Sequence, residues 1–234
     1  MGLRKRVPRL RLYGSDLVRS LSVVLAENLE DLLRKVDDGS GEFEKGFLHT
    51  STSPDHKPSY YHHMWARDVG RGIQELARYG FVEDAQSVVD YCLNHINSGD
   101  HWGRVVNFNA NEDYEIDGNT HILLGIYRTW LAAGRDKELG KRYVSGCMAV
   151  FHWFKRMLDE APYELLPCLS ELSGNPTVQY LVYAVFPTYG AMVSARAFAQ
   201  MAEECGMQKE SAFLKGLEKR IAEGLKKHLI SGRS

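Results

Sequence analysis

Apolar residues recur at helical spacing along almost the whole chain. Ser15 or Asp16 is suited to cap a first helix, and the run DDGSG at 37–41 ends it. Between them, residues 16–36 place a single apolar stripe on one face: Leu17, Leu21, Val24, Leu25, Leu29, Leu32 and Val36. This spacing predicts an amphipathic helix over 16–36.

Two kinds of helix are expected to alternate after this first one. Segments 119–133 and 188–204 are apolar on nearly every side, so we expect them to be buried all round. Segments 84–97, 138–158 and 208–229 carry a single apolar stripe, which is typical of helices that face water. The alternation predicts an all-α fold of helical hairpins, with inner and outer helices in two concentric layers.

Short turns and long loops are divided between the two ends of these hairpins. Each expected inner helix ends in a glycine (Gly80, Gly134 or Gly206), and an outer helix follows at once. The return from each outer helix is instead long and rich in polar and aromatic residues. Function usually lies where long loops gather on a helical scaffold. An ordinary helical bundle is the alternative, and VVNF at 105–108 is compatible with one short strand.

The composition excludes several classes of function. Of the 234 residues, 44% are hydrophobic and 25% are charged, and the net charge of −1 gives no basis for nucleic-acid binding. The basic start lacks the apolar run of a secretory signal, and no stretch is long enough to span a membrane. We therefore expect a cytoplasmic protein with a tail over 1–14 and a single domain over 15–234.

Metal and redox sites have little support in the sequence. His62 and His63 are adjacent and can both reach one ion, but no third ligand stands at a recognisable spacing from them, and Asp68 or His121 would be an arbitrary choice. The acidic segment 109–118 lacks the alternating ligands of a calcium loop, and Asp117 within it is suited to cap a helix. Four cysteines match no zinc or redox spacing and are interpreted as buried thiols: Cys92, Cys147, Cys168 and Cys205. We expect neither a metal nor a cofactor.

The run YHHMWARDVG at 61–70 gathers polar and aromatic groups where a long loop enters an inner helix. Arg67 offers a fixed fork of donors and Asp68 accepts only, so the adjacent pair is suited to hold neighbouring sugar hydroxyls. Tyr61 and Trp65 offer flat apolar surfaces for the C–H face of a sugar. The alternative is that the Arg–Asp pair fixes helix to loop and that the Trp lies in the core.

This motif resembles the substrate loop of the six-hairpin glycosidases, and most closely that of the glucoamylase-type glycoside hydrolases. The resemblance implies a partial (α/α)6 toroid in which Tyr61, Trp65, Arg67 and Asp68 surround the sugar next to the cleaved bond. The following loop, HWGR at 101–104 with Asp117-Gly118 after it, is also similar to the family. By the same resemblance, Asp117 belongs to the substrate site and Trp102 is an aromatic platform for a sugar.

Glycoside hydrolysis requires two carboxyl groups, which in inverting enzymes stand about 6.5–9.5 Å apart. The family carries its general acid in the loop before the third inner helix, where Glu171 is the candidate and Glu164 the reserve. Ser170 and Leu172 stand where the family usually has a Trp and often has an acidic residue. A solvated loop carboxylate is the alternative reading of Glu171.

The family's general base has no counterpart in this sequence. The resemblance spans 15–229 and covers about seven helices of the family's twelve, so we expect either part of a longer enzyme or a shortened relative. Inner helices at an open edge would expose apolar surface. We therefore expect the chain to associate with itself or with a missing C-terminal half.

Three functions fit these observations. The first is a glycoside hydrolase that acts by inversion on the non-reducing end of α-glucans or oligosaccharides. The second is a glycoside phosphorylase, in which phosphate replaces water. The third is a carbohydrate-binding or interaction module without catalysis.

Overall fold

The structure is a computed structural model, and it describes residues 12–49, 63–96, 100–106, 116–169 and 181–230. Seven α-helices account for most of these residues: α1 (Asp16–Arg34), α2 (Ala66–Arg78), α3 (Val82–Asn94), α4 (Ile116–Ala132), α5 (Lys137–Glu160), α6 (Val185–Glu204) and α7 (Gln208–Leu225). The π-helix η3 (Lys226–Ile230) continues α7. The predicted all-α class is confirmed, and the helices lie within a few residues of the expected ranges.

One small sheet was not expected from the sequence. β1 (Pro167–Leu169) pairs antiparallel with β2 (Leu181–Tyr183), and Cys168 stands opposite Val182. This sheet precedes α6, in a segment that the periodicity left as loop. Three-residue strands are too short to show an alternating pattern, so the sequence could not reveal them.

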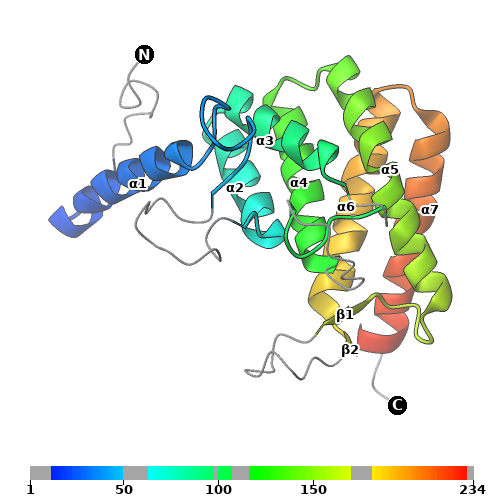
Figure 1. Cartoon of the computed structure of the whole chain (residues 1–234). Helices are drawn as coiled ribbons and strands as arrows, with labels where there is room; N and C mark the ends of the chain where they lie inside the picture. Colours follow the sequence, from blue (N-terminus) through cyan, green and yellow to red (C-terminus); the bar gives the residue numbers. More distant parts are fainter. Residues whose placement is uncertain (1–11, 50–62, 97–99, 107–115, 170–180, 231–234) are drawn as a thin grey trace.

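The helices form a row of three inner helices with outer helices beside them (Figure 1). α2 packs along α4, and α4 packs along α6. α3 packs on α2 and α4, α5 on α4 and α6, and α7 on α6 and α5. α2, α4 and α6 thus each pack against three or more other helices, whereas the toroid expected from the sequence stays a prediction.

Glycines allow the inner helices to approach closely. A Cβ on Gly70 would stand 2.3 Å from the backbone carbon of His121, and one on Gly125 would stand 2.9 Å from Ile73 Cβ. A Cβ on Gly190 of α6 would stand 2.8 Å from the hydroxyl of Thr120 on α4. Each contact is possible only without a side chain, so these glycines set the separation of the three helices.

The tight turns lie at one end of the helices, as the sequence predicted. Gly80, Gly134 and Gly206 have positive φ angles of 82°, 73° and 78°, which glycine adopts without steric cost. Each of these glycines follows an inner helix, and the next outer helix begins within three residues. The N-terminal ends of α2, α4 and α6 consequently lie together at the opposite end (Figure 1).

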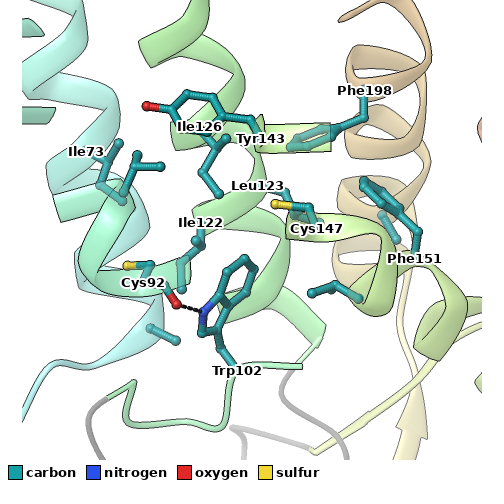
Figure 2. Close-up of a cluster of buried hydrophobic side chains, with 14 of the residues drawn as sticks. Ile73, Cys92, Trp102, Ile122, Leu123, Ile126, Tyr143, Cys147, Phe151 and Phe198 are labelled. Atoms are coloured by element: carbon teal, nitrogen blue, oxygen red, sulfur yellow. Dashed lines mark hydrogen bonds between the residues drawn. The ribbon is translucent and has the colours of Figure 1, made fainter. Parts of the chain in front are cut away.

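The core lies between the inner and outer helices and is continuous (Figure 2). Its largest fully buried side chains include Trp102, Trp130, Trp153 and Tyr143. The four cysteines are free and buried, which confirms the interpretation as buried thiols. Burial raises the pKa of the Cys92 and Cys147 thiols well above the ordinary value, so both remain protonated and unreactive.

The helix α1 projects from the other helices (Figure 1). Ser15 caps it by accepting a hydrogen bond from the amide of Val18 at 3.5 Å. Only the second half of its apolar stripe is covered, since Leu29 and Leu33 are buried while the first half is exposed. The loop 36–49 returns along the end of α1, where the amide of His49 donates to the carbonyl of Lys35 at 2.9 Å.

Candidate functional site

The N-terminal ends of α2, α4 and α6 bring together side chains from three segments that are far apart in the sequence. Ala66 and Gly118 are in contact between α2 and α4, and Thr120 and Gly190 are in contact between α4 and α6. We call the side chains that gather here the inner-helix cluster, and define it as Trp65, Arg67, Asp117, His121 and Phe186. Long loops enter all three helices at this end, which is where the sequence placed function.

Two of these loops are joined to each other by backbone hydrogen bonds. The amide of Ala66 donates to the carbonyl of Arg104 at 2.9 Å, and the amide of Val106 donates to the carbonyl of Met64 at 2.7 Å. Trp65 and Val105 consequently form an isolated antiparallel bridge. The sequence allowed a short strand at 105–108, and among the described residues only this single bridge at Val105 is present. The ladder fixes the position of Trp65 relative to the start of α4.

Trp65 is half-buried and has a guanidinium over one face of its indole. Arg104 Cζ lies 5.2 Å from the centre of the ring, at cation–π distance. The imidazole of His63 meets the same indole at its edge, with 6.1 Å between the ring centres. The indole is thus held in place while part of it remains in contact with solvent.

Arg67 and Asp117 form an ion pair that links α2 to α4. The distance from Arg67 Nη2 to Asp117 Oδ2 is 2.6 Å, and the side chains are 43% and 17% exposed. Asp117 Oδ1 also accepts from the amide of Gly118 at 2.9 Å. A carboxylate is favoured at this place because the first turn of a helix carries partial positive charge. The pair therefore presents fixed donors and acceptors at the surface.

His121 lies one turn after Asp117 and was not among the sugar-site residues expected from the sequence. Burial lowers the pKa of its imidazole, and the guanidinium of Arg71 lowers it further. The ring stands 6.0 Å from the ring of Phe186, which belongs to α6. Because this pKa lies below 6.5, the imidazole is neutral at pH 7 and can both donate and accept a hydrogen bond. Its four-residue spacing from Asp117 is the signal by which it could have been found.

The start of α6 contributes aromatic surface to the same end of the molecule. Phe186 is 61% exposed and Tyr189 is 53% exposed. Exposed aromatic rings beside fixed polar groups are common in sites that bind sugars, because the rings cover C–H faces. The sequence analysis expected 188–204 to be buried all round and so missed Tyr189, and it left Phe186 in the loop before that segment.

The expectation for Trp102 is wrong, since the structure places this residue in the core. Its side chain is fully buried, and its indole N–H donates to the carbonyl of Cys92 at 2.7 Å (Figure 2). Its backbone exchanges two hydrogen bonds with the Asn119 side chain, at 3.0 and 2.7 Å. Trp102 therefore anchors its loop to α3 and α4 and offers no face to a sugar.

Arg67 and Asp68 do not act as one adjacent pair. Successive residues of a helix point about 100° apart, so neighbours in sequence serve different sides. Arg67 is directed to Asp117 on α4. Asp68 is exposed and lines a pocket of about 300 Å³ between α1 and α2. Arg67 is therefore paired with Asp117 across the two helices rather than with its neighbour Asp68.

Three further candidates complete the comparison with the sequence. Tyr61 and the candidate acid Glu171 lie outside the described residues. The reserve candidate Glu164 is described, and its carboxylate stands 3.9 Å from Lys227 Nζ. The backbone of Glu164 also packs against α7, since a Cβ added to Gly224 would stand 2.3 Å from the carbonyl oxygen of Glu164. These contacts attach Glu164 to the end of α7.

The described part of the chain contains no group of three or more His, Cys, Asp or Glu side chains that could hold a metal ion. None of the helices in that part combines the length and the apolar character that crossing a membrane requires. Comparison of the chain with protein-family models, curated proteins and solved structures gives no match. The functional assignment consequently depends on the side chains and their geometry.

Proposed function

We propose that this chain binds the non-reducing end of an α-glucan or oligosaccharide at the inner-helix cluster. We further propose that it does so as a glycoside hydrolase of the six-hairpin type, with its helix rows forming part of an (α/α) toroid. The Arg67–Asp117 ion pair is the observation that carries the proposal. It holds a donor fork and a carboxylate at a distance of 2.6 Å on two helices, at the end where α2, α4 and α6 begin.

The groups around this pair match the two surfaces of a hexose. The hydroxyl edge of the sugar requires donors and acceptors, which Arg67, Asp117 and the neutral His121 supply. The C–H face requires flat apolar surface, which Trp65 at the start of α2 and Phe186 at the start of α6 supply. Charged hydrogen-bonding groups on helices keep their positions, so little conformational freedom is lost when a ligand binds.

Isothermal titration calorimetry with maltotriose tests the binding. Arg67→Ala removes the donor fork, and we expect Kd to rise about 10- to 100-fold, since hydrogen bonds to charged groups contribute about 1.5–3 kcal/mol. Arg78→Ala is the matched control, because Arg78 is an exposed arginine at the other end of the same helix. We expect this control to bind as the wild type does.

Turnover distinguishes the three functions that share this site. Incubation of the wild type with maltooligosaccharides should release glucose in the absence of phosphate if the chain is a hydrolase. Release only with phosphate identifies a phosphorylase, and binding without release identifies a binding module. Absence of maltotriose binding by a folded wild type would contradict the proposed site altogether.

A further inference from the structure

A pocket of about 300 Å³ lies between α1, the loop 36–49 and α2. This volume is at the lower end of the range for small-molecule sites. The argument below uses six of the residues that line it: Leu32, Lys35, Leu48, Asp68, Arg71 and Glu75. Arg67 is not among the lining residues, so the pocket is separate from the Arg67–Asp117 pair.

The pocket has an apolar floor that depends on one glycine. Leu32, Leu48 and Val69 supply the apolar groups. A Cβ on Gly72 would stand 2.5 Å from Leu48 Cδ2, so only glycine allows Leu48 to lie this close to α2. The floor is therefore formed by close packing of the loop against the helix.

Some polar side chains of the pocket are already paired within the protein, and others are not. Lys35 is held by Asp31 at 3.1 Å, and His49 stands 3.4 Å from Asp37. Asp68 and Arg71 are exposed one turn apart on α2, and in the described part of the chain neither side chain forms a hydrogen bond or an ion pair. One strong acceptor and one strong donor are thus available beside the apolar floor.

We propose that this pocket is a second carbohydrate position that takes one neutral pyranose unit. The choice of ligand rests on the proposed function. The two carboxylates, Asp68 and Glu75, balance the two cations, Lys35 and Arg71, so the lining selects for neither an anion nor a cation. A pyranose presents hydroxyls on its edge and C–H groups on its face, which match the polar rim and the apolar floor.

The sequence motif suggested a single sugar-binding position, whereas we propose two. The resemblance assigns Arg67 and Asp68 to the same sugar, whereas the structure directs them to different sides of α2. Asp68 and Arg71 also act electrostatically on His121, so the two positions are neighbours. A sugar in the pocket would lie beside the one bound at the inner-helix cluster.

Nuclear magnetic resonance can report on both positions separately. The methyl groups of Leu48 and Val69 report on the pocket, and the indole N–H of Trp65 reports on the inner-helix cluster. D-glucose and maltotriose are the probes. Leu32→Trp fills the pocket from α1, and Leu21→Trp on the exposed part of the same helix is its control. Asp68→Asn is a second variant at an exposed position, which keeps the test valid if Leu32→Trp unfolds the protein.

We expect glucose to shift the Leu48 and Val69 methyl signals in the wild type, in Leu21→Trp and in Arg67→Ala. Leu32→Trp and Asp68→Asn should weaken that response at least about tenfold, because one hydrogen bond to a charged group is lost or the space is filled. Glucose that shifts the Trp65 signal without the methyl signals would overturn the pocket and leave the proposed function standing. Equal methyl shifts in Leu32→Trp would also overturn the pocket. Absence of any shift with glucose and maltotriose would overturn both.

Discussion

At the scale of single residues, two arginines fix the side chains at the start of α2. Arg67 is bound to Asp117 at 2.6 Å, while Trp65 is covered on one face by Arg104 at 5.2 Å. Both aromatic and charged groups are therefore held in position by contacts within the protein. Such positioning reduces the entropy lost on binding, and it makes each side chain a separate target for mutation.

Trp102 and Trp65 should respond in opposite ways to substitution by Phe. Trp102→Phe removes the indole N–H that bonds to the Cys92 carbonyl, and we expect a loss of about 1–3 kcal/mol in unfolding free energy without a change in sugar affinity. Trp65→Phe should weaken maltotriose binding with little loss of stability, because the indole is half-buried. Urea denaturation and calorimetry measure the two effects. A stable Trp102→Phe variant that no longer binds maltotriose would restore Trp102 as a sugar platform.

His121 should make stability depend on pH in a defined direction. Burial holds its folded-state pKa below the unfolded value of 6.5, so the unfolded chain binds more protons as the pH falls below 6.5. The stabilisation is present above pH 6.5 and is lost as the pH falls from there through the folded-state pKa. In urea denaturation, His121→Asn should lose less stability over this window than the wild type loses. Identical slopes in the two proteins would contradict the lowered pKa.

At the scale of helices, much of the fold could be predicted from the sequence. Periodicity located the seven helices, and Gly80, Gly134 and Gly206 marked the turns, because both signals are local. The direction of a single side chain depends on tertiary packing, which no local pattern contains. For this reason the motif correctly indicated that Arg67 is placed at an inner-helix start, while the sequence could not show that its partner is Asp117.

Close packing of α2 against α4 should make Gly70 intolerant of a side chain. A Cβ on Gly70 would stand 2.3 Å from the backbone of His121, so Gly70→Ala must push the helices apart, at a cost of about 1–3 kcal/mol. Gly216→Ala is the matched control, since nothing lies within 4 Å of a Cβ there and the position is exposed on α7. The control should gain up to about 1 kcal/mol from helix propensity. Thermal unfolding of both variants measures the difference, and equal stability would contradict the predicted close approach.

At the scale of the whole molecule, exposed apolar surface is the feature that most requires explanation. Leu17 and Leu21 of α1 are 74% and 46% exposed, and Val24 of the same stripe is 48% exposed. Further along the helix this stripe is continuous with Leu29, which is buried. We propose that this apolar face is covered by a second copy of the chain, since contiguous exposed apolar patches are rare on monomers. The expected self-association therefore has a definite candidate surface on α1.

Size-exclusion chromatography with light scattering should show an oligomer for the wild type. Leu17→Glu combined with Leu21→Glu should yield a monomer, because a charged stripe cannot be buried without a partner. Arg128→Glu on α4 is a charge-changing control at an exposed position away from α1. A monomeric wild type over a wide concentration range would remove the basis for association through this helix.

A double-mutant cycle on the Arg67–Asp117 pair tests most directly whether this pair holds a sugar. The affinity for maltotriose is measured for the wild type, Arg67→Ala, Asp117→Ala and the double variant. Because the two groups act as a unit, we predict that each single change raises Kd about 10- to 100-fold and that the double change adds little more. Single variants that are folded and bind maltotriose as tightly as the wild type would contradict a sugar site built on this pair.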